Sequence, residues 1–140
     1  MTNKTFYSSH SEITNPGEYQ FLFDNLPDDI SELCKVTQGI MVHIHWAEMC
    51  GVTVSEERRH EEDLRKVERQ LSLITERTPR SNPIKLPIKQ RIFGTCMGFS
   101  TILCSMLRHQ RIPARPRCGF VTYFESLVKT DHWIYSSSRE

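Results

Sequence analysis

One cysteine in the second half of the chain has the sequence context of a nucleophile. Cys96 opens an apolar stretch whose spacing predicts a helix as far as His109. Gly94 allows a sharp turn into this helix, and the Thr95 hydroxyl is expected to cap it by accepting a backbone N–H. The first amides and the positive end of the helix dipole then favour thiolate over thiol. A thiolate is the nucleophile that cysteine enzymes use.

A histidine later in the chain can serve as the base for this nucleophile. His132 stands 36 positions after Cys96, in a run of residues 131–135 that predicts a strand. Pro113 ends the preceding helix, and residues 114–124 predict another strand, antiparallel to the first. This order predicts that the Cys96 sulfur and the His132 imidazole meet across one cleft.

Length and composition indicate one domain over residues 1–140. The chain is 38% hydrophobic and 25% charged, which argues against disorder. Its N-terminus lacks a signal-peptide pattern and no apolar run approaches 18 residues, so we expect a soluble cytoplasmic protein without membrane contact. The five cysteines are odd in number and form no C-x-x-C pair. We therefore expect no disulfide framework, no structural zinc site and no cofactor.

Charge is distributed unevenly although the net charge is only +1. Residues 1–76 carry 14 acids against 7 bases, and residues 77–117 carry 9 bases and no acid. Such asymmetry is found in nucleic-acid-binding proteins. Because the bases are interrupted by prolines and apolar residues, we favour packing of the acidic half against the basic half, and no nucleic-acid partner.

Helical periodicity dominates the first half of the chain. After an arm over residues 1–15, we predict a short helix over 18–25, a long helix over 27–49 that stops before Gly51, and a third helix over 55–78. The charged run 56–69 predicts a solvated face with i,i+4 pairs Glu61/Arg65 and Glu62/Lys66. His43 and His45 would lie on different faces of the long helix, which excludes a shared metal ion. Residues 79–90 are expected to be extended and irregular.

The ordered residues from 91 to 135 resemble the bacterial transglutaminase-like family. The resemblance comprises Cys96 at a helix start, Leu107-Arg108-His-Gln-Arg-Ile112-Pro113-Ala114-Arg115, Gly119-Phe120 and Asp131-His132-Trp133. Residues 11–19 also resemble the N-terminal part of one bacterial branch of that family. The resemblance implies an α+β fold of the papain/transglutaminase-like type, with N-terminal helices followed by a small antiparallel sheet.

The same resemblance implies cysteine acyl-transfer or amide hydrolysis on a protein or peptide amide. Cys96 would be the nucleophile, and His132 the general base and later acid. Backbone amides at the helix start would hold the oxyanion. Gln90 is a candidate for an additional side-chain donor, against the simpler interpretation of an exposed loop glutamine.

The sequence departs from the family pattern after His132. The family usually orients its histidine with an aspartate on the next strand, whereas this chain ends eight residues on. Asp131 points to the opposite face of its strand, and Glu140 would lie about 26 Å further along a continuous strand. We therefore expect a domain that lacks its last strands and its third catalytic residue. The exposed terminal strand makes a homodimer plausible.

Another departure concerns the end of the Cys96 helix, where Arg111 stands at a position that the family tends to give to glycine. If the backbone there is left-handed, arginine costs on the order of 1 kcal/mol.

Two other functions remain open: a catalytically inactive, truncated relative that acts as a binding protein, and a nucleic-acid-binding module.

Overall fold

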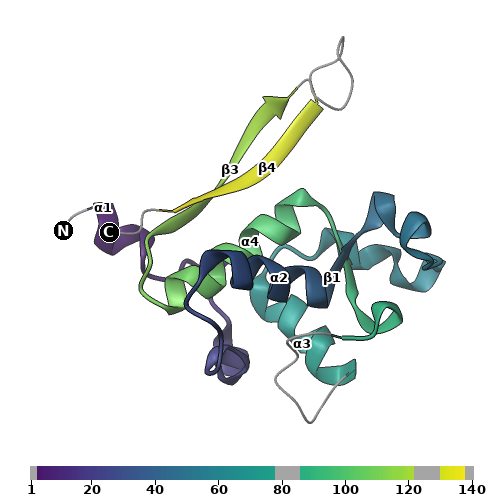
Figure 1. Cartoon of the computed structure of the whole chain (residues 1–140), viewed down its shortest axis with the longest axis horizontal. Coiled ribbons are helices and arrows are strands. Elements are labelled where there is room, and N and C mark those ends of the chain that lie inside the picture. Colours follow the sequence, from purple (N-terminus) through teal and green to yellow (C-terminus); the bar gives the residue numbers. More distant parts are fainter. Residues whose placement is uncertain (1–2, 78–85, 122–129, 138–140) are drawn as a thin grey trace.

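Helix α4 (Cys96–His109) is the element to which the other main elements attach. The computed structural model describes residues 3–77, 86–121 and 130–137. In Figure 1, α4 packs against α2 (Ile30–Ile40) and α3 (Val67–Arg77), and it also lies along the base of a hairpin formed by β3 (Ala114–Val121) and β4 (Thr130–Ser137). Helices thus come first and a small antiparallel sheet comes last, which confirms the predicted α+β class.

The buried face of α4 forms the centre of the main core. Ile102, Leu103, Met106 and Leu107 are all buried as predicted, whereas Phe99 is only partly buried. Cys104 is fully buried among them, and burial raises the pKa of its thiol to about 12. A thiol in this state is inert at neutral pH, as expected for a core cysteine.

Helix α4 ends in the hydrogen-bond pattern of a Schellman motif. The Ile112 N–H donates to the Leu107 carbonyl at 2.9 Å and the Arg111 N–H donates to the Arg108 carbonyl at 3.0 Å. The motif needs a left-handed residue at Arg111, whose φ is 64°. The condition set for this position, a left-handed backbone, is therefore met, and arginine carries its steric cost.

Replacing Arg111 by glycine is expected to raise the free energy of unfolding by about 1 kcal/mol, because glycine adopts positive φ without a Cβ clash. Urea denaturation of the two proteins measures the difference. Arg111 is exposed, so the substitution removes little packing. A glycine variant less stable than the parent would show that the arginine side chain contributes more than its backbone strain costs.

The long helix predicted over 27–49 is wrong beyond Ile40. Helix α2 begins at its N-cap Asp29, whose carboxylate accepts the Glu32 N–H, and ends at Ile40. The chain then forms strand β1 (Met41–His43) and 3₁₀ turns at Ile44–Trp46 and Glu48–Cys50. Met41 and Val42 are both buried, and a strand buried on both faces cannot be distinguished from a helix by periodicity. The left-handed Gly51 follows the last turn rather than a helix.

Strand β1 pairs in parallel with β2 (Ile92–Gly94), the three residues that lead into α4. This pair was not predicted. A second, smaller core lies beside it, formed by Val42, Ala47, Val52 and Phe93. The pair therefore fixes the approach to Cys96 from a segment about 50 residues earlier in the chain.

The helix predicted over 55–78 is interrupted. Residues Glu56–Asp63 form a 3₁₀ helix, the chain is extended at Leu64, and α3 begins at Val67. Val67, Leu71 and Ile74 are buried as expected, and the described helix ends at Arg77.

Of the predicted irregular segment 79–90, residues 79–85 lie outside the described residues. Leu86 is buried and Ile88–Gln90 form a 3₁₀ turn.

The N-terminal segment follows the predicted arm only in part. It contains a short helix α1 (Asn3–Tyr7), and the helix predicted over 18–25 is a 3₁₀ helix at Gly17–Phe23. Between them, Thr14 is buried. The Ser105 hydroxyl donates to the Thr14 carbonyl, which anchors the arm on α4.

Candidate functional site

Cys96 is the first residue of α4, as the sequence predicted. It is partly buried, and it follows β2 after the single N-cap residue Thr95. The Thr95 hydroxyl makes no capping hydrogen bond, so that part of the prediction is wrong. The first amides of α4 are therefore not taken up by the Thr95 side chain, and they point along the helix axis in the geometry that stabilises an anion.

Two glycines around Cys96 lie in close packing with neighbouring side chains rather than in a turn. A Cβ at Gly94 would overlap the Met41 sulfur, and a Cβ at Gly98 would lie 3.2 Å from the Gln70 side-chain nitrogen. Neither glycine has a positive φ. The prediction of a sharp turn at Gly94 is therefore wrong, because Gly94 is the last residue of strand β2. The pairing of β2 with β1 fixes the position of the Cys96 backbone.

A buried carboxylate holds the segment before β2 in place. Glu61 is 2% exposed, and its carboxylate accepts hydrogen bonds from Arg58 at 2.7 Å and from Arg77 at 2.9 Å. It also accepts the Phe93 backbone N–H at 3.2 Å. The Arg58 guanidinium lies 4.3 Å from the centre of the Phe93 ring and donates to the Arg91 carbonyl at 2.6 Å. We call Glu61, Arg58 and Arg77 the Glu61 network.

Most of the charged side chains in the predicted solvated run 56–69 are exposed, and Glu61 is the charged residue of that run that is buried. Glu61 points inward and pairs with Arg58 and Arg77 rather than with Arg65. Burial alone would raise the pKa of Glu61, but the hydrogen bonds and positive charges of Arg77 and Arg58 outweigh burial and hold it below its ordinary value of 4.5. The carboxylate is therefore ionised at neutral pH.

The pairing of Glu61 with Arg77 also bears on the uneven charge distribution. Arg77 is the first base of the acid-free stretch 77–117, and its partner lies in the acidic half of the chain. Arg108, from the same stretch, is buried. These two bases therefore belong to the interior packing of the domain and not to an exposed basic surface.

His132 lies on β4, opposite Gly119 of β3 in the antiparallel register. Strand β4 lies against α4, the helix that begins with Cys96 (Figure 1). The side chain of His132 and the whole of Glu140 lie outside the described residues. Asp131 is opposite Phe120, one register position from His132.

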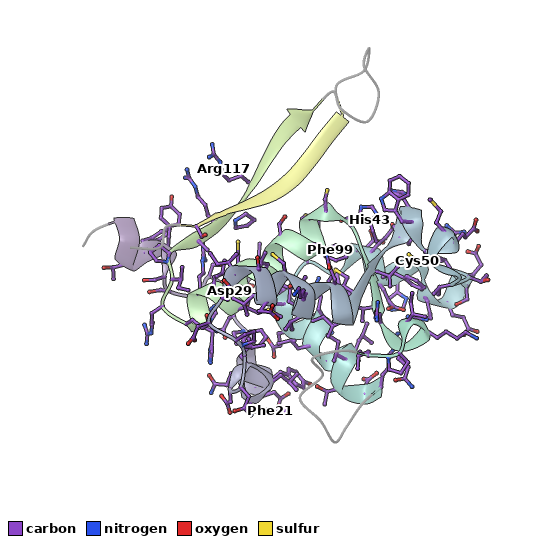
Figure 2. The ribbon with its side chains drawn as sticks, in the orientation of Figure 1. Phe21, Asp29, His43, Cys50, Phe99 and Arg117 are labelled. Atoms are coloured by element: carbon purple, nitrogen blue, oxygen red, sulfur yellow. The ribbon has the colours of Figure 1, made fainter. Side chains whose placement is uncertain are left out.

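A second histidine lies next to the Cys96 turn, and the sequence analysis did not assign it to the site. His43 ends β1 opposite Gly94, two residues before Cys96. Its ring stacks on Phe99, one turn after Cys96, with 6.3 Å between ring centroids and 15° between planes. Figure 2 shows His43 and Phe99 on these neighbouring elements. The apolar spacing of the sequence predicts a helix over residues 41–43, and a helix there would not pair His43 with Gly94.

His43 and His45 do not lie on opposite faces of a helix. Their ring centroids are 5.3 Å apart, so the prediction that the two side chains lie on different faces of one helix is wrong. Among residues 3–77, 86–121 and 130–137, however, no group of three His, Cys, Asp or Glu side chains has the arrangement of a metal site.

Two further features were considered for the site, the Gln90 side chain and a surface cavity. Gln90 is exposed in the Ile88–Gln90 turn. A cavity of about 730 Å³ is lined mainly by α2, the segment before it and Arg91, and neither Cys96 nor His43 lines it. In the part of the chain that the structure describes, no helix is long and apolar enough to cross a membrane.

Comparisons of this chain with protein-family models, with curated proteins and with solved structures gave no match.

Proposed function

We propose that this protein is a transglutaminase-like cysteine acyltransferase or amidohydrolase, with Cys96 as nucleophile and His132 as general base. The observation that carries the proposal is the placement of Cys96 as the first residue of α4, while α4 lies against the strand that bears His132. This is the arrangement expected from a papain/transglutaminase-like fold, which we propose for the chain. Its substrate would be a protein or peptide carboxamide.

The chemistry divides into two halves. The Cys96 thiolate attacks the carboxamide carbon, and the electron pair of the carbonyl moves onto oxygen. Amides at the start of α4 stabilise this oxyanion, and His132 protonates the departing ammonia or amine. His132 then takes a proton from an amine or a water molecule, which attacks the thioester and releases the product together with the thiolate.

The first test compares the reactivity of cysteines within the same protein. At pH 7 an ordinary thiol is only about 3% thiolate. We expect iodoacetamide to alkylate Cys96 at least roughly tenfold faster than the exposed Cys50, because an activated cysteine is largely thiolate. Peptide mass spectrometry over a time course follows both residues in one sample.

The His132→Ala variant is expected to reduce the Cys96 rate to near that of Cys50. His60→Ala is the matched control, since His60 is exposed on the Glu56–Asp63 helix, and it should leave the ratio of the two rates unchanged. Equal rates for Cys96 and Cys50 in the parent protein would contradict an activated nucleophile and favour the inactive, binding relative. A glutamine peptide with a labelled amine then distinguishes transfer from hydrolysis.

A further inference from the structure

His10 of the N-terminal arm packs against the last residue of α4. Its ring stacks on His109, with 6.2 Å between the ring centroids and 30° between the ring planes. The buried Phe23 contacts His109 edge-on, with 5.5 Å between the centroids. The end of α4 thus carries a cluster of three rings, one of which belongs to the arm.

The surroundings of His10 suit a neutral imidazole and do not suit a charged one. His10 Nδ1 lies 3.4 Å from Thr14 Oγ1. That oxygen already accepts the Ser11 backbone N–H at 2.9 Å and Arg108 Nη1 at 3.3 Å, so it has no lone pair left for an N–H on Nδ1. His10 Nε2 is buried and has no hydrogen-bond partner among the described residues. A second proton on the ring would therefore leave a buried positive charge without an acceptor.

The charges that act on His10 from α4 and from the turn after it are positive. Burial is the main cause that lowers the pKa of His10 below its ordinary value of 6.5. Positive charge on three neighbours lowers it further, in the order His109, Arg108 and Arg111. The position of the ring, the occupied Thr14 oxygen and the neighbouring cations all disfavour protonation while the arm is docked.

The arm meets the body of the domain a second time at the start of α3. The Val67 backbone N–H donates to the Ile13 carbonyl at 2.9 Å, and the Lys66 ammonium pairs with the Glu12 carboxylate at 2.8 Å. Glu12 is the one acid in the sequence of the arm, and this ion pair directs it to Lys66. The hydrogen bond of Val67 exists only while the arm is docked, so this amide reports on docking.

We propose that the N-terminal arm is a pH-sensitive clamp, in which uptake of a proton by His10 in mildly acidic medium releases residues 10–14 from α4 and from the start of α3. Because the pKa of His10 is below 6.5 in the docked arm, the released arm binds a proton more readily. Docking is therefore strongest above pH 6.5 and weakens as pH falls below it, through the pKa of the docked state. This inference does not depend on the chemistry proposed for Cys96.

Amide hydrogen exchange, followed by NMR, measures release of the arm without unfolding of the domain. The control amide is that of Leu86, which donates to the Gly39 carbonyl at 2.8 Å and joins two segments outside the arm. Both protection factors are corrected for the intrinsic exchange rate at each pH, and their quotient is the Val67/Leu86 ratio. From about pH 7.5 to about pH 5, we expect this ratio to fall by roughly threefold or more. The ring signals of His10 follow its protonation in the same sample.

His10→Phe separates protonation from packing. Phenylalanine keeps an aromatic ring against His109 and takes up no proton, so the Val67/Leu86 ratio should then vary by less than about 1.5-fold over the same pH range. The matched control is His60→Phe, because His60 is exposed on the Glu56–Asp63 helix. This variant should keep the pH dependence of the parent.

Arg111→Gly provides a second test with a variant that is expected to be more stable than the parent. It removes one of the cations that act on His10, whereas burial, His109 and Arg108 remain. The fall in the Val67/Leu86 ratio should therefore be smaller than in the parent, without disappearing. An undiminished fall would show that the charges around His10 do not control the arm.

Three results would overturn the clamp. The Val67/Leu86 ratio stays constant in the parent while His10 becomes protonated, or it falls as far in His10→Phe as in the parent. In the third, Val67 and Leu86 lose protection together, which shows unfolding of the domain at low pH and not release of the arm. None of these measurements involves Cys96, so failure of the proposed function would leave the clamp standing, and failure of the clamp would leave the proposed function untouched.

Discussion

Replacing Glu61 by glutamine is expected to lower the free energy of unfolding by about 3 kcal/mol, measured by urea denaturation at pH 7. Glutamine matches glutamate in shape but has no charge to balance Arg58 and Arg77. Removing one partner of a buried ion pair typically costs about 3–5 kcal/mol, because the remaining charge loses its compensation. The Arg58 and Arg77 side chains keep 25% and 22% of their exposure, so water can partly solvate them and the lower end of the range applies.

The contribution of Glu61 to stability depends on pH in a defined direction. Because the pKa of Glu61 is lower in the folded protein than its ordinary value of 4.5, the unfolded chain binds a proton more readily. The stabilisation is therefore present above pH 4.5 and is lost as pH falls below it, through the folded pKa. The difference in stability between the parent and Glu61→Gln should narrow over that acidic range.

Glu57→Gln is the matched control for Glu61→Gln. Glu57 lies in the same 3₁₀ helix and is exposed, so its substitution should change stability by less than about 0.5 kcal/mol. A loss below about 1 kcal/mol for Glu61→Gln would mean that the two arginines relax into solvent, and that the Glu61 network is not what holds the segment before β2.

Replacing Arg108 by alanine is also expected to lower the free energy of unfolding by about 3 kcal/mol, measured by urea denaturation. Arg108 is 6% exposed, and its Nε donates to the carbonyl of Ala114, the first residue of β3, at 2.8 Å. Its Nη1 donates to the Thr14 hydroxyl at 3.3 Å. Hydrogen bonds from a charged donor contribute about 1.5–3 kcal/mol each, and alanine also removes the buried stem. The arginine thus links α4, the N-terminal arm and the hairpin that bears His132.

A cost opposes these contacts, because burial disfavours the charged guanidinium. Burial lowers the pKa of Arg108, while the nearby Cys104 and Tyr7 act in the opposite direction. Removing the side chain recovers this desolvation cost, which is why the expected net loss is smaller than the sum of the two bonds and the packing. Arg108→Met keeps most of the volume without the charge, and its stability should lie between those of the parent and the alanine variant.

Arg117→Ala is the control for Arg108→Ala, because Arg117 is exposed on β3 and points away from the helical body in Figure 2. Arg117→Ala should leave the free energy of unfolding nearly unchanged.

An Arg108→Met variant more stable than the parent would contradict the prediction, since the desolvation cost of Arg108 would then exceed the strength of its hydrogen bonds. Arg108→Ala and Arg111→Gly should shift the urea midpoint in opposite directions, although the two arginines are only three residues apart.

Local features of the sequence were sufficient for α4 and for the hairpin. The apolar spacing after Cys96 gave the helix its correct bounds, and Pro113 with the alternating residues that follow gave the antiparallel strands. A left-handed backbone at Arg111 entered only as a condition, at a position where the resemblance to the transglutaminase-like family implies glycine, and the structure meets that condition. In each case the interactions join residues near one another in the chain, so composition and spacing carry the information.

Only the tertiary structure decided how the candidate site is surrounded. Residues 41–43 became a strand because Ile92–Gly94 pair with them, and this pairing brings His43 to the Cys96 turn. Glu61 turned inward because two arginines and the Phe93 N–H could satisfy a buried carboxylate. Such partners lie up to some 50 residues apart, and neither periodicity nor propensity records which distant segment completes a hydrogen bond. The sequence by itself determined the helix that begins at Cys96, and long-range pairing determined which side chains lie beside its first residue.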